Sequence, residues 1–256
     1  MVQEILLVGR HDNYASLTLN RPERRNALNV KLIEEFDRAL ADLENDQTIR
    51  ALVIKGAGST FCSGIDLREV DQMRGPHNPI GIQRLLERVE KFPVPTIAAI
   101  QGAALAGGLE LALHCDIRVA ASTARLGMTV ARVGLVVPFK LTRKLIQTVG
   151  TGGAAEILFT GEPVAARRAH EIGMVHEVVE ETALDSAVDS WIKKISGNAP
   201  LSLRAIKANI RRCMSGAFDA EHQDLDELAR QVRASQDAKE GVRAFLEKRK
   251  PVWRAC

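Results

Sequence analysis

The sequence predicts an α/β protein, and three observations support this fold class. Short apolar strands alternate with amphipathic helical segments in the first part of the chain, glycine-rich turns follow two of these strands, and the last part has a helical pattern throughout. With 256 residues, of which 46% are hydrophobic, the chain can bury one large core. We expect a core over 1–195 and a helical region over 196–256.

The first elements are a hairpin and an amphipathic helix. Residues 3–9 and 14–20 are expected to be strands, because YASLTLN alternates and HDN marks a turn between the two. Over 29–43, apolar residues recur at helical spacing while charged residues occupy the other face. The next expected elements are strands at 51–55, 96–100 and 116–121, a helix near 82–91, and a variable segment over 66–80.

Beyond Gly127 the pattern becomes increasingly helical. Pro163 and Gly173 bracket one expected helix, because proline favours the first helical position and glycine the position just past the end. The helices expected in this part lie at 139–149, 152–159, 163–172, 182–196, 199–214, 218–234 and 236–249, with a strand over 174–179.

Composition narrows the classes of function. The 35 basic and 32 acidic residues give a net charge of +3 and are spread along the chain, which argues against a nucleic-acid partner. No basic leader precedes an apolar stretch, and no uncharged apolar run could span a membrane, so we expect a cytoplasmic protein with no membrane partner. The four cysteines are widely spaced without a C-x-x-C pair, which predicts reduced thiols and no metal site.

Two glycine turns are the candidate ligand-binding loops. FCSGIDL (61–67) and AGGLE (106–110) each follow a predicted strand, where a helix start offers unpaired backbone N–H groups. Glu110 comes three residues after Gly107, so its carboxylate is expected close to these N–H groups. Glu110 is therefore a candidate acid or base. The alternative is that it only stabilises the first turn of a helix through the helix dipole.

Two polar residues near Glu110 also have alternative interpretations. His114 lies four residues later on the same helical face and could hydrogen-bond the glutamate, but we favour a hydrogen-bonded core histidine. Asp116 begins the next strand, and we expect it to be a structural hydrogen-bonding group.

At these residues the chain resembles the crotonase family, the enoyl-CoA hydratase/isomerase superfamily. The resemblance rests on LTLNRPERRNALN (17–29), FCSGIDL (61–67), PTIAAIQGAALAGGLELALHCDIRVAA (95–121), AHEIGMVHEVV (169–179) and SQDAKEGVRAFLEKRKPVW (235–253), in this order and at these distances. It implies a spiral of repeated ββα units with a C-terminal helical trimerisation region, and a homotrimer or hexamer.

The resemblance also implies a site for an acyl-CoA thioester. The backbone N–H groups of Ile65 and Gly107 would form an oxyanion hole, and Glu110 would be the catalytic acid or base. Coenzyme A enters as part of the substrate, and no permanently bound cofactor is expected. The substrate-binding positions that the resemblance implies are Arg25, Ala27, Leu28, Ser63, Gly64, Ile65, Asp66, Leu67, Arg68, Gly107, Gly108, Val130 and Phe139, with Phe245 and Lys248 contacting coenzyme A on a neighbouring subunit.

The chain departs from the hydratase pattern at one catalytic position. Hydratases of the family carry a second glutamate in a Pro-Glu pair, and here Thr129 and Val130 occupy those positions. A valine cannot hold a water molecule or exchange a proton. Arg132 or Thr129 could substitute, although we favour a solvated charge and a strand residue for them. Phe139 is expected to reshape the acyl pocket.

These residues predict an enzyme acting on acyl-CoA. The first hypothesis is water addition or a double-bond shift on a 2-enoyl-CoA thioester, through an enolate held at the oxyanion hole. The alternatives are another reaction of the family, such as decarboxylation or thioester hydrolysis, and a non-catalytic acyl-CoA-binding protein.

Overall fold

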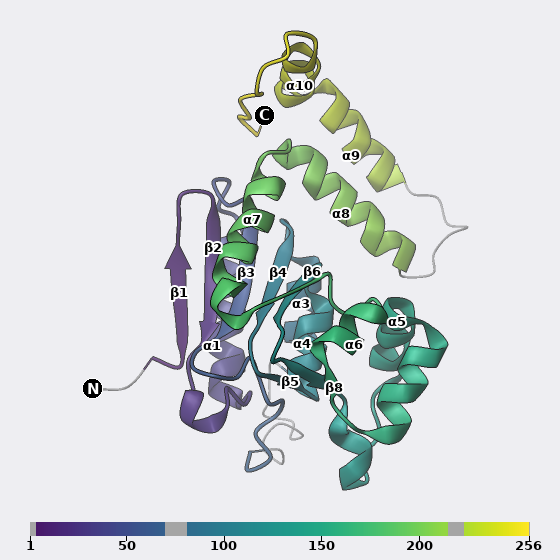
Figure 1. The fold of residues 1–256 in the computed structure, drawn as a ribbon. Helices are drawn as coiled ribbons and strands as arrows, with labels where there is room; N and C mark the ends of the chain where they lie inside the picture. Colours follow the sequence, from purple (N-terminus) through teal and green to yellow (C-terminus); the bar gives the residue numbers. More distant parts are fainter. Residues whose placement is uncertain (1–3, 70–80, 215–222, 256) are drawn as a thin grey trace.

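The computed structural model describes residues 4–69, 81–214 and 223–255. It shows a twisted sheet with helices on both faces, a small second sheet, and a C-terminal set of helices that extends away from the sheets (Figure 1). The α/β prediction is confirmed. Most of the expected variable segment, 70–80, lies outside the described residues.

The larger sheet has six strands in the order β1-β2-β3-β4-β6-β9. β1 and β2 form the expected antiparallel hairpin, and the other neighbours pair in parallel. The strand bounds are β1 (Leu6–Arg10), β2 (Tyr14–Leu19), β3 (Ala51–Gly56), β4 (Thr96–Ile100), β6 (Ile117–Ala121) and β9 (Glu177–Val179).

Alternation along the central strands buries both faces of this sheet. Leu52 and Ile54 of β3 belong to the main core, whereas Val53 belongs to a second cluster that packs on the other face. Strands covered on both faces need continuous apolar sequence, which explains ALVI in β3 and TIAAI in β4.

The second sheet contains β5 (Ala103–Leu105), β7 (Arg125–Gly127) and β8 (Val164–Ala165). An isolated bridge between Cys62 and Ala104 adds the chain after β3 to this layer. The chain after β3, β4 and β6 therefore crosses in each case from the large sheet to the small one. This repetition brings the two glycine turns to neighbouring positions.

The helices follow the expected pattern closely. Asn29 caps α1, because its side chain accepts a hydrogen bond from the Leu32 N–H at 3.0 Å. The main helices are α1 (Val30–Glu44), α3 (Ile82–Lys91), α4 (Gly107–His114), α5 (Phe139–Thr160), α6 (Ala166–Glu171), α7 (Leu184–Ser196), α8 (Pro200–Met214), α9 (Gln223–Ala234) and α10 (Gln236–Leu246).

Two local predictions need correction. Pro163 does not begin a helix, because the next two residues pair with β7 as β8 and the helix starts only at Ala166. Gly173 does follow that helix, with φ of 77°. Thr129 is not in a strand but begins a 3-10 turn over Thr129–Val133. The break expected between the helices at 139–149 and 152–159 is confirmed, because Gly150 interrupts α5 with non-helical φ and ψ of 71° and 170°.

The C-terminal helices contact the core through a buried ion pair. Lys207 of α8 donates to Asp116 at 2.6 Å and to the Val94 carbonyl at 2.9 Å. Asp116 also accepts from the N–H and hydroxyl of Thr96, so its predicted structural role is confirmed. Whether the region after 195 is a separate trimerisation unit stays a prediction.

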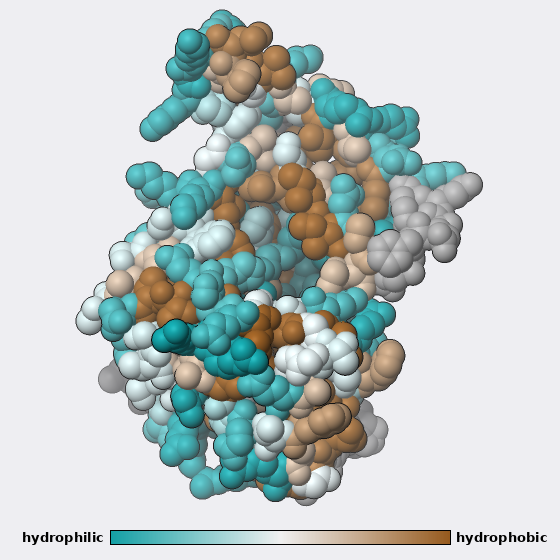
Figure 2. All heavy atoms as spheres, turned by 45° about the vertical axis from the view of Figure 1, so that its right-hand side comes forward, coloured by the Kyte–Doolittle hydropathy of each residue, from teal (hydrophilic) through white to brown (hydrophobic). Residues whose placement is uncertain are grey.

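The outermost helix presents an apolar surface. Val242, Phe245 and Leu246 of α10 are exposed at the top of the molecule (Figure 2). None of the helices in the described part of the chain is long and apolar enough to cross a membrane. Nor does the described part contain three His, Cys, Asp or Glu side chains grouped to hold a metal ion.

Candidate active site

A cavity of about 670 Å³ lies where the two glycine turns meet. Its walls come from the loop after β3, the first turns of α3 and α4, and the 3-10 turn after β7. The residues that line it are Ala27, Ser63, Ile65, Asp66, Leu67, Gly81, Ile82, Gln83, Ala106, Gly107, Glu110, Thr129, Val130, Val133 and Leu135.

The backbone around Ile65 leaves its N–H group directed away from the neighbouring chain. Leu28 and Ile65 form a parallel bridge in which the Leu28 N–H donates to the Gly64 carbonyl at 2.7 Å and the Leu28 carbonyl accepts from the Asp66 N–H at 2.8 Å. Because successive residues of an extended chain point their amides to opposite sides, the Ile65 N–H points away from Leu28.

The second N–H group belongs to Gly107, the first residue of α4. At this position a helix has no internal acceptor for the amide. A Cβ built on Gly107 would lie 3.4 Å from the Ile65 nitrogen, so the two turns are in contact. Gly108 is far more constrained, because a Cβ there would lie 2.1 Å from the Cys62 carbonyl oxygen. Glycine at both positions allows this close approach.

The chain enters α4 through a strained residue. Ala106 has φ of 47° and ψ of −119°, a conformation that residues with a Cβ rarely adopt. Its N–H donates to the Gly127 carbonyl at 2.9 Å, and its carbonyl accepts from the Glu110 N–H at 3.0 Å. These two hydrogen bonds hold the turn that directs the Gly107 amide.

Glu110 lies in the first turn of α4 and lines the cavity. Burial raises the pKa of its carboxyl group to about 7. No donor in the described part of the chain forms a hydrogen bond or ion pair with this carboxylate, so no partner offsets the cost of burying the charge. The carboxyl group can therefore both accept and release a proton at neutral pH.

The wall near Glu110 is mainly apolar. Val130 is among the lining residues, and Thr129 is the neighbouring polar group. Asp66 is the second carboxylate among the lining residues, but it pairs with Arg21 at 3.1 Å and both side chains are nearly buried. Glu110 is thus the one lining carboxyl group without a cation partner in the described residues.

His114 lies behind Glu110 and contacts its backbone. Its Nδ1 is 2.8 Å from the Glu110 carbonyl oxygen, and its Nε2 is 3.9 Å from a Glu90 oxygen. Burial lowers the pKa of His114, so Nδ1 can donate from the neutral ring. The favoured interpretation, a hydrogen-bonded core histidine, is confirmed.

Several predicted positions support the cavity without facing it. Leu28 is fully buried and positions the Gly64–Asp66 backbone. Arg25 adopts φ of 51°, and its carbonyl accepts from the Ser63 N–H at 3.0 Å. Arg68 is exposed at the end of the same loop.

Other predicted positions lie apart from the cavity. Phe139 is 80% exposed at the start of α5 and does not line it. Phe245 and Lys248 lie at the far end of the C-terminal helices (Figure 1). Their expected contact with coenzyme A on a neighbouring subunit stays a prediction. Arg132 pairs with Glu162 at 3.1 Å on the surface, as the favoured interpretation predicted.

The sequence interpretation missed part of the cavity wall. Ile82 and Gln83 come from the first turn of α3, and Val133 and Leu135 come from the segment after Thr129. Their local pattern carries no signal for a site, because the packing of α3 on α4 brings the first pair to Glu110 and the course of the chain between β7 and α5 brings the second. Arg21, the partner of Asp66, was also missed, although it stands in the quoted NRPERRNAL segment.

Comparison with known proteins identifies the family of the chain. The family model described as enoyl-CoA hydratase/isomerase matches residues 9–255. A short-chain-enoyl-CoA hydratase of Clostridium acetobutylicum is 34% identical over 96% of this chain and 95% of its own length. A probable enoyl-CoA hydratase of Bacillus subtilis is 36% identical over 93% of both chains.

Comparison of the fold with solved structures identifies the same family. The crystal structure of an enoyl-CoA hydratase/carnithine racemase from Magnetospirillum magneticum superposes with a TM-score of 0.92 and 33% identity, covering 99% of this chain and 97% of the other. The predicted ββα architecture and the resemblance are confirmed. The chain belongs to the enoyl-CoA hydratase/isomerase family.

Proposed function

We propose that the protein adds water to a 2-enoyl-CoA thioester, with Glu110 as its single acid and base. The observation that carries this proposal is the position of Glu110. Its carboxyl group, which has no partner among the described residues and a pKa of about 7, shares one cavity with Ile65 and Gly107. The names of the relatives as enoyl-CoA hydratases support the same reaction.

The two amides would stabilise negative charge on the thioester oxygen. Each donor of this kind contributes roughly 3 kcal/mol to the stability of a transition state. As the oxygen of water bonds to C3 of the enoyl group, the π electrons move toward the thioester oxygen and form an enolate. Glu110 takes the proton of the water and then delivers it to C2, so that H and OH are added across the double bond.

Thr129 would hold the attacking water on the side where Val130 cannot. Thr129 lines the cavity, and a hydroxyl group can accept and donate hydrogen bonds. A hydroxyl cannot exchange protons as a carboxylate does at neutral pH. The reaction therefore depends on Glu110 for both proton transfers.

A double-bond shift is the second candidate, favoured by the single unpaired carboxyl group. One base can remove a proton from a 3-enoyl-CoA at C2 and return it at C4. This reaction passes through a dienolate, whose oxygen would be held by the same two amides, and it needs no water. It would leave Thr129 without a catalytic role.

Product mass separates these candidates. Wild-type protein is incubated with 2-enoyl-CoA and 3-enoyl-CoA thioesters of several chain lengths, with Glu110→Gln as control. We expect a product heavier by one water from the 2-enoyl substrates. Unchanged mass with a shifted double bond would favour the second candidate. Release of free coenzyme A, or tight binding without turnover, would contradict both.

A further inference from the structure

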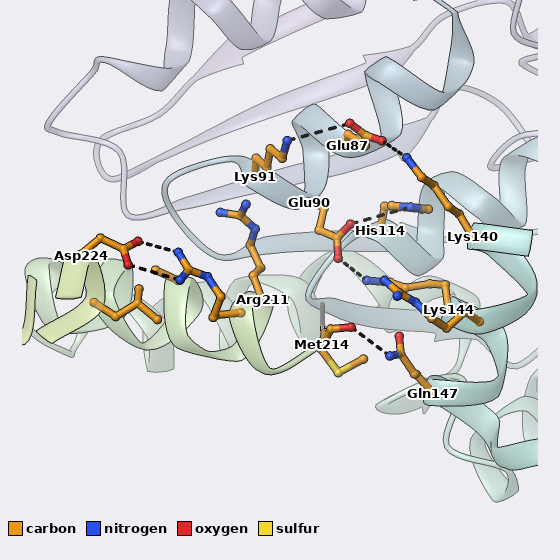
Figure 3. Close-up of a pocket in the computed structure, with 14 residues that line it drawn as sticks. Glu87, Glu90, Lys91, His114, Lys140, Lys144, Gln147, Arg211, Met214 and Asp224 are labelled. Carbon is orange, nitrogen blue, oxygen red and sulfur yellow. Dashed lines mark hydrogen bonds and ion pairs between the residues drawn. The ribbon is translucent and has the colours of Figure 1, made fainter. Parts of the chain in front are cut away.

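A second cavity lies between the core and the C-terminal helices. It has a volume of about 570 Å³, within the range of small-molecule sites, and shares no lining residue with the cavity beside Glu110. Side chains from α3, α4 and α5 form one side, and side chains from α8 and α9 form the other (Figure 3). A ligand here would contact both parts of the molecule.

Positive charge dominates this cavity. Among the residues that the structure describes, six lysine and arginine side chains line it against three carboxylates, and neutral His114 adds no charge, so these side chains carry a net charge of +3. The lining cations are Lys91, Lys140, Arg143, Lys144, Arg211 and Arg212.

Each carboxylate at the cavity is already paired. Lys140 contacts Glu87 at 2.9 Å, and Lys144 contacts Glu90 at 2.8 Å. Asp224 of α9 accepts two hydrogen bonds from the guanidinium group of Arg212 of α8. The carboxylates therefore neutralise half of the cations.

Two arginines remain available for a ligand. Within the described residues, neither Arg143 nor Arg211 forms a hydrogen bond or ion pair with a carboxylate. Arg211 is half-buried, and its guanidinium group points from α8 across the cavity toward α3 (Figure 3). A guanidinium group offers several N–H donors in a fixed geometry that matches phosphate oxygens.

We propose that this cavity binds a small anion with two linked phosphate groups, held by Arg143 and Arg211 with support from the paired lysines. The excess of three positive charges matches a ligand with several negative charges better than a single carboxylate. No Phe, Tyr or Trp side chain lines the cavity among the described residues, so these residues recognise charge and not a stacked base. The recognised group is the diphosphate itself.

Calorimetric titration of the full-length protein with inorganic pyrophosphate tests this site. We expect one pyrophosphate per chain, bound more weakly as salt increases. Arg211→Gln and Arg143→Gln should each weaken binding about tenfold, the loss of one charge-assisted contact of about 1.4 kcal/mol. Arg167→Gln is the matched control, because it removes one positive charge from the exposed face of α6.

The control and a competition experiment make the test decisive. No binding, or equal weakening in Arg167→Gln, would overturn the proposal, because the attraction would then come from overall charge. Unchanged unfolding curves for the variants exclude loss of fold. The titration is repeated with a non-reactive acyl-CoA at saturation. Unchanged pyrophosphate affinity is expected, whereas competition would show that the phosphates of coenzyme A occupy this cavity and would overturn a separate site.

Discussion

Glu110 and Glu90 lie on either side of His114, and their carboxyl pKa values are shifted in opposite directions. Glu110 lines the cavity of the glycine turns and has no partner within residues 4–69, 81–214 and 223–255, and burial raises its pKa to about 7. Burial also acts to raise the pKa of Glu90, but the hydrogen bond and charge of Lys144, with smaller contributions from His114 and Arg211, outweigh it and lower the pKa. An available partner thus decides whether a half-buried carboxylate is reactive or structural.

The largest expected difference between the two glutamates is in turnover. Glu110→Gln should lower kcat by about 10²- to 10⁴-fold, because an amide cannot move the proton. Glu90→Gln should leave kcat near the wild-type value. Steady-state assays on 2-enoyl-CoA measure both, and calorimetry should show that Glu110→Gln still binds acyl-CoA. Equal losses of kcat in the two variants would contradict a catalytic role that belongs to Glu110 and not to Glu90.

Substituting the two glutamates should change the free energy of unfolding in opposite directions. The folded-state pKa of Glu110 is raised from 4.5 to about 7, so wild-type stability falls as pH rises between these values. Glu110→Gln avoids this cost. Its free energy of unfolding should be about 3 kcal/mol higher than that of the wild type above pH 7 and nearly the same below pH 4.5.

Glu90→Gln provides the opposite case. The pKa of Glu90 is lowered in the folded protein, so its pair with Lys144 contributes stability above the ordinary carboxyl pKa and loses it as pH falls. We expect a loss of about 1 to 2 kcal/mol at neutral pH, since both side chains are partly exposed. Urea unfolding at several pH values measures both variants, and destabilisation by Glu110→Gln at pH 8 would contradict the assignment.

The pH dependence of the reaction should follow Glu110 alone. Hydration needs the ionised carboxylate, so kcat/KM should fall about tenfold per pH unit below pH 7. The kcat/KM of Glu90→Gln should fall in the same way below pH 7. If kcat/KM of the wild type instead began to fall only near pH 4.5, Glu110 would titrate as an ordinary carboxyl group.

The smallest expected effect concerns the turn that places Glu110. Ala106→Gly should relieve the strain of its positive φ and stabilise the fold by about 1 kcal/mol, with turnover unchanged because the Gly107 amide remains. Ala103→Gly in β5 is the matched control and should destabilise by about 0.5 to 1 kcal/mol. Thermal unfolding measures both, and a loss in Ala106→Gly would show that the residue is unstrained.

The sequence by itself determined most of the secondary structure and the identity of the catalytic candidate. The alternation in YASLTL, the apolar runs ALVI and TIAAI and the Asn29 cap are local patterns, so the structure reproduces the elements that they predict. Gly107 and Glu110 stand one helical turn apart in the chain, which places them together whatever the rest of the fold does.

Tertiary structure decided what no local pattern carries. Pro163 lies before a strand because β7 is available for pairing, and Phe139 is exposed at the start of α5 rather than in the cavity. The contact between the Ile65 and Gly107 turns depends on the crossing of the chain between two sheets. The raised pKa of Glu110 and the lowered pKa of Glu90 depend on which side chains from other elements surround each carboxylate, because desolvation and charge pairing act through space.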